Sequence, residues 1–96
     1  MIPAAGDVYL ADARDETRRQ VLVVSDSRLH RATGRAIVAP VIEHVEGDDS
    51  PWRVGIDERF AVDYLTTLPL DRLLERVGRV DALTVRQARR AVTASL

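Results

Sequence analysis

Hydrophobic and polar positions follow one pattern over the first two thirds of the chain and another over the last third. Up to about residue 65, short apolar or alternating runs are separated by turn-rich segments, which is typical of β-strands. After that, the apolar positions recur with a helical period. The predicted strands are residues 7–11, 21–26, 36–41 and 52–56, with shorter ones at 61–65 and 77–80.

Two of these runs, residues 21–24 and 37–41, are apolar at successive positions, as strands buried on both faces are. We therefore expect them to be central in a sheet. Pro40 interrupts the second run. Proline has no N–H to donate to a ladder, so we expect it at a bulge or where the neighbouring strand has already ended.

Turn-forming residues predict loops at 12–17, 27–34 and 43–51. A short helical turn is predicted at 70–76, because four apolar residues from Leu70 to Val77 share one helical face. The last helix is predicted to begin at a cap on Asp81 or Thr84 and to run to about Leu96. Its apolar stripe is Val85, Ala88, Val92 and Leu96, and its outward residues are Arg86, Arg89, Arg90 and Thr93.

These elements predict a single domain over residues 1–96 of mainly β class, a small antiparallel barrel or strongly bent sheet with one C-terminal helix. At this length roughly 60 to 65% of the unfolded chain's surface is buried on folding. The core is therefore thin, and a partner subunit would add to it.

Composition narrows the classes of protein further. Hydrophobic residues make up 46% of the chain, but no apolar stretch approaches the ~20 residues that span a bilayer. The N-terminal residues lack the pattern of a secretory signal, so we expect a cytoplasmic protein without membrane contact. With no cysteine and only two histidines, neither a disulfide framework nor a structural zinc is expected.

Charge is distributed unevenly although the net charge is only −1. Residues 14–35 carry six arginines against three acidic residues, whereas residues 43–49 carry four acidic residues and no cation. All fourteen basic residues are arginine, which we interpret mainly as a compositional bias. Arg18 and Arg19 stand where a buried strand begins, and a guanidinium at the mouth of a small β-core is suited to bind phosphate.

Several short motifs, in their order and spacing, are similar to those of the MazF/PemK (Kid) family of bacterial toxins. The motifs are GDVY at 6–9, RQVLVVSD at 19–26, HRATG at 30–34, AIVAPV at 36–41, DYL at 63–65 and LLERVGRV at 73–80. The resemblance covers nearly the whole chain. It implies an SH3-like barrel that forms a homodimer and cuts single-stranded RNA at short sequences, without a metal or other cofactor.

The resemblance also implies a protein partner, an antitoxin whose C-terminal tail covers the active groove. CcdB-type gyrase poisons share the fold and give the alternative function, as does a lapsed nuclease that only binds RNA or an antitoxin. Gyrase poisons of this fold use a tryptophan-containing C-terminus. This chain ends in Ala94-Ser95-Leu96, without an aromatic residue, which favours RNA over gyrase.

Three residues are expected to carry the chemistry if the resemblance holds. Arg19 matches the family's catalytic arginine and is expected to stabilise the phosphate, since a guanidinium rarely gives up a proton. Asp63 matches its functional aspartate and is the candidate base. His44 is a weaker acid–base candidate. The structural alternatives are a surface ion pair for Arg19, a turn or capping carboxylate for Asp63, and a solvated histidine for His44.

RNA binding is assigned to Arg18, Arg28 and Arg31 through phosphate contacts, and to Tyr64 through stacking on a base. Trp52 is more simply explained as a core or dimer residue.

The chain departs from the family pattern at three places. Ile42 stands where many nucleases of the family have threonine or serine at the end of the third strand. Losing that hydroxyl is expected to cost ~1 to 3 kcal/mol, or about a 10- to 100-fold loss of rate. Gln20 replaces a proline, and the loop from residue 13 to residue 18 is short, so the recognised RNA sequence is not fixed by the resemblance.

Overall fold

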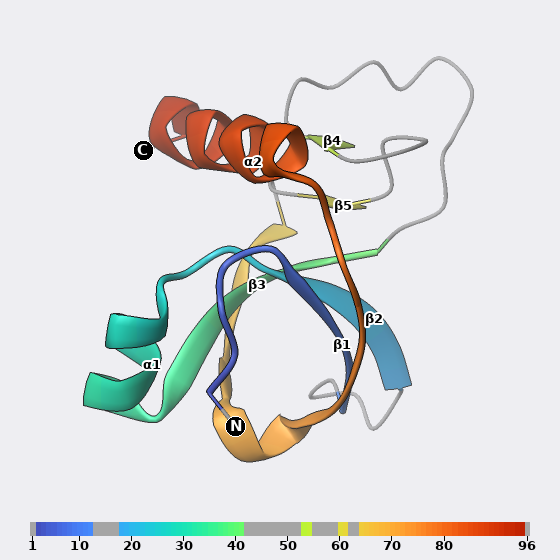
Figure 1. Cartoon of the computed structure of the whole chain (residues 1–96), viewed down its shortest axis with the longest axis vertical. Coiled ribbons are helices and arrows are strands. Elements are labelled where there is room, and N and C mark those ends of the chain that lie inside the picture. The colour runs from blue at the N-terminus through green and yellow to red at the C-terminus, as the bar shows by residue number, and fades with distance from the viewer. Residues whose placement is uncertain (1, 13–17, 42–52, 55–59, 62–63, 96) are drawn as a thin grey trace.

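The structure is a computed structural model that describes residues 2–12, 18–41, 53–54, 60–61 and 64–95 (Figure 1). Five strands form the main sheet, a two-residue pair lies beside it, and two α-helices and one 3₁₀ helix complete the described part of the chain. In chain order the elements are β1 (Asp7–Asp12), β2 (Arg18–Val23), α1 (Ser27–Thr33), β3 (Arg35–Pro40), β4 (Arg53–Val54), β5 (Phe60–Ala61), β6 (Thr66–Pro69), η3 (Leu70–Arg72), β7 (Leu73–Arg79) and α2 (Ala82–Ser95).

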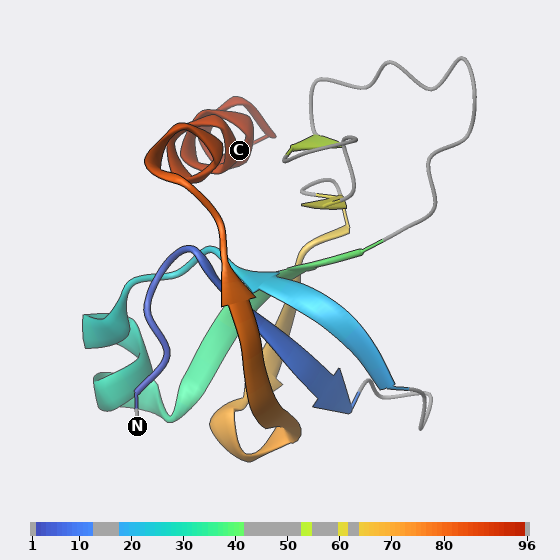
Figure 2. The ribbon, with the colours of Figure 1, turned by 45° about the vertical axis from the view of Figure 1, so that its right-hand side comes forward.

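The main sheet has the order β6-β3-β2-β1-β7, and every neighbouring pair is antiparallel. Its two edge strands are joined by the three residues of η3, so the sheet curls until its edges approach each other (Figure 2). Register shifts between β1 and β7 accompany this curvature. The prediction of a mainly β fold, a bent antiparallel sheet with a C-terminal helix, is confirmed, and β2 and β3 are central as expected.

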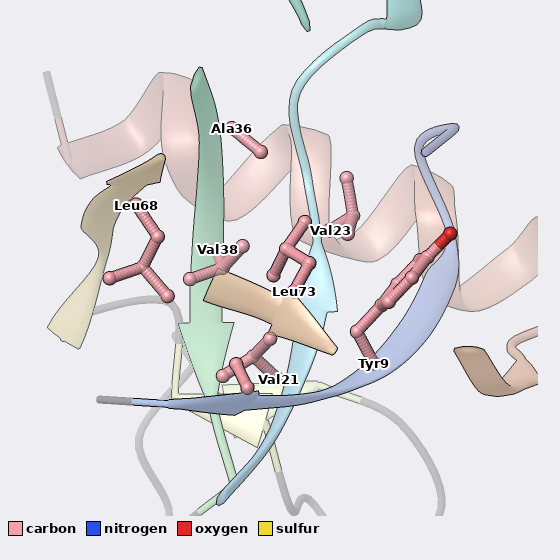
Figure 3. Packing of buried hydrophobic residues seen from close by; sticks show 8 residues of the cluster. Tyr9, Val21, Val23, Ala36, Val38, Leu68 and Leu73 are labelled. Carbon is pink, nitrogen blue, oxygen red and sulfur yellow. The ribbon is translucent and has the colours of Figure 1, made fainter. Parts of the chain in front are cut away.

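Successive residues of β2 point to opposite faces of the sheet, and both faces are buried. The inner cluster, which fills the curled sheet, is Tyr9, Ala11, Val21, Val23, Ala36, Val38, Leu68 and Leu73 (Figure 3). The outer cluster is Val8, Leu22, Ala39, Phe60, Ala88 and Ala91, and it lies between the sheet and α2. The two apolar faces explain why these strands read as continuous hydrophobic runs.

Helix α2 confirms the predicted C-terminal helix. The carboxylate of Asp81 accepts a hydrogen bond of 2.8 Å from the backbone N–H of Thr84, as an N-cap does. Ala88 and Ala91 are buried against the sheet. In the described part of the chain no helix is long and apolar enough to span a membrane.

Pro40 lies where the neighbouring strand has ended, as predicted. Strand β6 pairs with β3 only from Arg35 to Val38. The next residue after Pro40, Val41, donates its N–H to Gln20 of β2, so the nitrogen of Pro40 faces the other way, beyond the end of β6. The missing donor therefore leaves no gap in the ladder.

Three predictions of local structure were wrong. Residues 27–34 form helix α1 with its C-cap, not a loop: Asp26 caps the start of the helix, and Gly34 ends it in the left-handed conformation, at a φ of 68°. Within 70–76 only Leu70–Arg72 is helical, because Leu73 begins β7 and packs in the inner cluster. The predicted strand at 61–65 is also corrected, since β5 ends at Ala61 and β6 begins at Thr66.

Candidate functional site

Arg18 and Arg19 open strand β2 and are exposed, as is Gln20, while the next three residues of the strand are buried. The register sets Asp12 opposite Arg18 and Ala11 opposite Arg19. The start of β2 therefore presents two guanidinium groups beside the end of β1. Because the strand behind them is central and buried, their backbone positions are fixed by the sheet.

The two arginines point to different faces of the sheet. Arg19 has the same parity along β2 as Val21 and Val23, which belong to the inner cluster. Its cross-strand neighbour Ala11 is small and belongs to the same cluster. Arg19 is thus placed at the rim of the curled sheet, across from a small side chain.

Arg18 has the opposite parity and forms an ion pair with Asp12, with 3.5 Å between Nε and Oδ1. Both side chains are largely exposed, so the pair contributes at most ~1 kcal/mol to stability. No local motif marks Asp12. The register does, since it pairs the last residue of β1 with the first residue of β2.

The end of β3 lies next to these arginines. The backbone N–H of Val41, the residue after β3, donates to the carbonyl oxygen of Gln20 over 3.0 Å. Gln20 is next to Arg19 in β2, so the end of β3 lies close to the backbone of Arg19. Ile42 follows in the sequence, but it lies outside the described residues, as do Asp63 and His44. The roles predicted for Asp63 and His44 stay predictions.

Tyr64 lies toward the same end of the sheet. It precedes β6 by two residues, and the first residue of β6, Thr66, pairs with Val38 near the end of β3. Its side chain is 60% exposed, which is high for a tyrosine. By these registers the start of β2, the end of β3 and the approach to β6 lie toward one end of the sheet, with Arg18 and Arg19 on its opposite faces.

Arg28 and Arg31 do not join this group. Both lie on α1, which begins beyond the other end of β2, and six strand residues span about 20 Å. Arg28 forms an ion pair of 3.1 Å with Asp26. The backbone N–H and then the side chain of Arg28 lower the pKa of the Asp26 carboxyl by hydrogen bonding. The arginine-rich segment predicted from the sequence is thus divided between two ends of the molecule.

A buried polar network holds the far end of β2. His30 is fully buried; its Nδ1 lies 2.7 Å from the carbonyl oxygen of Pro3 and its Nε2 lies 2.6 Å from Oγ of Ser25. The same Oγ accepts the backbone N–H of Ile37 over 2.8 Å. This network joins the N-terminal segment, α1 and β3, and nothing in the sequence pattern had marked it.

A second polar cluster fixes β1 against β7. The buried carboxylate of Asp7 accepts hydrogen bonds from Arg79 over 2.8 Å and from the backbone N–H of Ala4 over 2.9 Å, and Arg76 lies 3.8 Å from it. Burial, and then the charge of Asp7, raise the pKa of the Tyr9 phenol. Both effects keep Tyr9 neutral inside the inner cluster, so these groups support the barrel rather than offer a reactive site.

The described residues contain no group of three or more histidine, cysteine or acidic side chains placed to hold a metal ion. The start of β2 presents fixed positive charge. A guanidinium can bind a phosphate oxygen through two parallel N–H donors and stabilise negative charge that develops there.

The profile of one protein family matches residues 4–96; the family is described as PemK-like, MazF-like toxin of type II toxin-antitoxin system. No curated protein matches the chain. Among solved structures, a MazE–MazF complex from Deinococcus radiodurans has a TM-score of 0.80 at 22% identity, covering 99% of this chain and 96% of that one.

Two further solved structures have the same fold. An endoribonuclease in complex with its cognate antitoxin, from a mycobacterial species, has a TM-score of 0.76 at 22% identity, covering 97% of this chain and 93% of that one. The toxin MazF-mt6 of Mycobacterium tuberculosis has a TM-score of 0.69 at 18% identity, covering 93% and 94%.

Proposed function

Because the chain belongs to the PemK-like, MazF-like toxins of type II toxin-antitoxin systems, we propose that it is an endoribonuclease that cuts single-stranded RNA in the cytoplasm without a metal ion. One observation carries this proposal: Arg19 stands exposed at the rim of the barrel, on a strand that the sheet holds rigidly. A nuclease that uses no metal needs a fixed cation of this kind to bind the phosphate undergoing transfer.

The proposed reaction is an internal transfer at phosphorus. The 2′-oxygen of one nucleotide attacks the adjacent phosphate, a new O2′–P bond forms, and the P–O5′ bond breaks. A base takes the 2′-hydroxyl proton and an acid protonates the leaving 5′-oxygen, so the products are a 2′,3′-cyclic phosphate and a free 5′-hydroxyl. Negative charge grows on the non-bridging phosphate oxygens, and the guanidinium of Arg19 stabilises that charge.

The remaining roles follow the sequence resemblance. Asp63 is the proposed base, and His44 is the weaker candidate for acid or base. Arg18 and Tyr64 lie toward the same end of the sheet as Arg19. Arg18 is proposed to bind a neighbouring phosphate, and Tyr64 is proposed to stack on a base. Arg28 and Arg31 lie too far away to share the same phosphate, and we leave them out of this proposed site.

We further propose two protein partners, an antitoxin and a second copy of the chain. Complexes with an antitoxin are what two of the similar structures contain. For the dimer, the edge strand β7 exposes Leu74 at 43% and Val77 at 46%, and the first turn of α2 exposes Leu83. Apolar side chains on an unpaired edge favour pairing with another chain. A strictly monomeric mass at micromolar concentration would overturn the homodimer.

The direct test is cleavage of end-labelled single-stranded RNA in the presence of a chelator. Wild-type protein should cut it and leave a cyclic phosphate, and Arg19→Ala should lower the rate by about 100-fold or more, as loss of a group that stabilises developing charge does. Arg35→Ala is the matched control. Arg35 is an exposed arginine that also opens a strand, and it lies at the start of β3, whereas the proposed site is near the end of β3. Intact RNA together with inhibited gyrase would instead support the gyrase-poison alternative.

A second variant tests the family's phosphate-binding hydroxyl. If Ile42 occupies the place of the usual threonine, Ile42→Thr should raise the cleavage rate, by up to about 10- to 100-fold. Ile42→Val is its control, because valine has the shape of threonine without the hydroxyl. Equal rates for the two variants would show that the phosphate has no hydroxyl ligand at this position.

A further inference from the structure

Helix α2 carries three arginines on its outward face. They are Arg86, Arg89 and Arg90; all three are exposed, and the helix contains no acidic residue. Successive helix residues point about 100° apart, so the three share one sector, turned away from Ala88 and Ala91, which pack on the sheet. In Figures 1 and 2 the sheet lies on one side of α2, and no described element covers the other side. We call these three residues the α2 arginine stripe.

The contacts that usually explain arginines on a helix do not explain this stripe. In the part of the chain that the structure describes, none of the three forms an ion pair. Cations also stabilise a helix through its dipole when they lie in the last turn, but the last turn of α2 contains no basic residue. The charge of the stripe is therefore left uncompensated by the described part of the fold.

The spacing of the stripe opposes the stability of α2. Arg86 and Arg90 are four residues apart, Arg86 and Arg89 are three apart, and like charges at these spacings destabilise a helix. The chain as a whole has a net charge of only −1, so the stripe does not reflect a basic protein. An anion bound across the stripe would offset the repulsion. The arrangement therefore points to an anionic ligand.

We propose that the α2 arginine stripe binds the phosphodiester backbone of the RNA strand, at phosphates other than the one that is cut. This inference rests on the proposed function, which makes RNA the substrate. Arg86 and Arg90 are one turn apart, about 6 Å along the helix axis, and a polynucleotide presents one phosphate per nucleotide. The guanidinium fork matches a phosphate, and such contacts position a strand without reading its sequence.

The shape of the stripe favours a polynucleotide over an acidic peptide. Proteins bind peptides mainly in grooves or along the edges of sheets, where apolar side chains of the peptide are buried. The outward side of a single helix is neither a groove nor a sheet edge. Repeated backbone charge is the feature of RNA that a row of exposed guanidinium groups can hold.

The stripe is separate from the residue proposed to act on the scissile phosphate. Helix α2 packs over Leu22, which is three residues, or about 10 Å, along β2 from Arg19. The stripe lies on the far side of α2 from the sheet, and a helix with its side chains is about 10 Å thick. The stripe should therefore change how tightly RNA is held, and not how fast bound RNA is cut.

The test measures the salt dependence of RNA binding. A 20-nucleotide 2′-O-methyl RNA lacks the nucleophile and stays intact, and its affinity for the full chain is followed by fluorescence anisotropy from 0.05 M to 0.2 M sodium chloride. Substituting both Arg86→Gln and Arg90→Gln should lower the slope of log affinity against log salt by about 1.4, since each phosphate contact on a single strand contributes about 0.7. In 0.1 M salt, that corresponds to roughly 25-fold weaker binding.

The matched control substitutes Arg35→Gln and Arg72→Gln, which remove the same charge elsewhere. Both arginines are exposed. They lie near each other at the start of β3, because the backbone N–H of Leu70 donates to the carbonyl oxygen of Gly34 over 3.0 Å. This double variant should keep the wild-type slope. An equal loss of slope in both double variants would show diffuse charge attraction and would overturn the proposal.

Three further measurements test the other roles that the stripe could have. Removing the like-charge repulsion should leave the Tm of Arg86→Gln with Arg90→Gln unchanged or raised, since glutamine is a good helix former. A lowered Tm would show that the arginines hold the fold, and an altered mass in solution would place them between copies of the chain. If a 20-residue polyglutamate binds the stripe more tightly than the RNA does, the stripe is a peptide site. Each of these results overturns the proposal.

Failure of this proposal is distinguishable from failure of the nuclease proposal. With saturating unmodified RNA, the Arg86→Gln and Arg90→Gln double variant should cut at the wild-type rate. In an Arg19→Ala background, the two substitutions should lower the slope by the same amount. Normal cleavage with an unchanged slope would overturn the stripe alone. Binding through the stripe without cleavage by the wild-type protein would overturn the nuclease alone, and a chain that does not bind RNA would overturn both.

Discussion

The two ends of strand β2 differ in how their polar groups are held. At its start, Arg18, Arg19 and Gln20 are exposed. Past its end, Ser25 and His30 are buried and bonded to each other. The start of the strand exposes arginine side chains to solvent. The residues after its end link three segments of the chain by hydrogen bonds.

Hydrogen-bonding roles at the buried end can be assigned from the partners alone. The carbonyl oxygen of Pro3 only accepts, so Nδ1 of His30 carries the proton. Nε2 of His30 and Oγ of Ser25 form the second hydrogen bond, and Ser25 Oγ also accepts from the N–H of Ile37. Every group in the network is satisfied, so each removal leaves a buried partner unpaired.

The comparison indicates that the residues after the end of β2 contribute to stability, whereas its exposed start carries the site that we propose for ligand binding. Changes at the buried end should lower the free energy of unfolding without altering the exposed end. Changes at the exposed end should do the reverse.

His30→Ala should give the largest loss of stability, about 3 kcal/mol, because it leaves a cavity and strips partners from Ser25 and Pro3. For a domain of this length, that lowers Tm by roughly 12 to 24 °C. Denaturant unfolding followed by circular dichroism measures it. Arg31→Ala, one residue on and exposed, is the control and should change stability by less than about 0.5 kcal/mol.

His30→Phe refines this prediction. Phenylalanine fills most of the imidazole's volume but makes neither hydrogen bond, so it should recover the cavity part of the loss and not the polar part. If His30→Phe is as stable as wild type, the network does not fasten the end of β2, and the contrast between the two ends fails.

Two glycines near the buried end should differ in their tolerance of alanine. Both have positive φ, 96° at Gly6 and 68° at Gly34. A Cβ at Gly6 would lie 2.8 Å from Cγ2 of Val85, whereas a Cβ at Gly34 meets nothing within 4 Å. Gly34→Ala should therefore cost about 1 kcal/mol of backbone strain, and Gly6→Ala about 2 to 3 kcal/mol.

The double variant Gly6→Ala with Val85→Ala separates strain from crowding. Removing the valine methyl groups should return the cost of alanine at position 6 to that at Gly34. If Gly6→Ala is no worse than Gly34→Ala, the close approach of the N-terminal turn to α2 is not tight in solution.

The sequence predicted the strands that bury both faces and the helix with a continuous apolar stripe. Such patterns predicted strands β1 to β3 and helix α2. The position of Pro40 beyond the end of the neighbouring strand was predicted from its missing N–H donor. Helix α1 was missed because it has seven residues and buries mainly one, His30, so it has no stripe to detect. Its signal was in the caps, an aspartate before and a glycine after, which also suit a loop.

The candidate site was predictable only in part, for a physical reason. Arg18 and Arg19 follow from the local pattern of a charged pair before a buried strand. Asp12 and Tyr64 lie toward the same end of the sheet because of the register of β1 with β2 and of β6 with β3. No local sequence pattern predicts these registers. The separation of Arg28 and Arg31 from Arg19 likewise depends on the length of β2, not on distance along the sequence.

Arg19→Ala gives a smaller and opposite kind of effect at the exposed end. Arg19 is an exposed residue, so stability should change by less than about 0.5 kcal/mol while RNA cleavage falls. Unfolding and cleavage are measured on the same preparation. A loss of stability comparable to that of His30→Ala would mean that the guanidinium holds the fold, and the site proposed at the start of β2 would be lost with it.

The smallest expected effect is an acid sensitivity at the cap of α1. Hydrogen bonds from the backbone N–H and side chain of Arg28 lower the pKa of Asp26 below its unfolded value of about 3.9. A lowered folded-state pKa means that the cap's contribution is fully present above pH 3.9 and is lost as pH falls through the folded pKa. Amide exchange in α1 should therefore accelerate, relative to the rest of the chain, between pH 4 and pH 2.

Asp26→Ser isolates the titration, because serine accepts the same N–H bond without carrying a charge. Its α1 should show no extra acceleration over that pH range, although it loses the ion pair with Arg28. If wild type and Asp26→Ser respond alike, acid acts on α1 through another group. The stability of α1 would then not depend on the charge of its own N-cap.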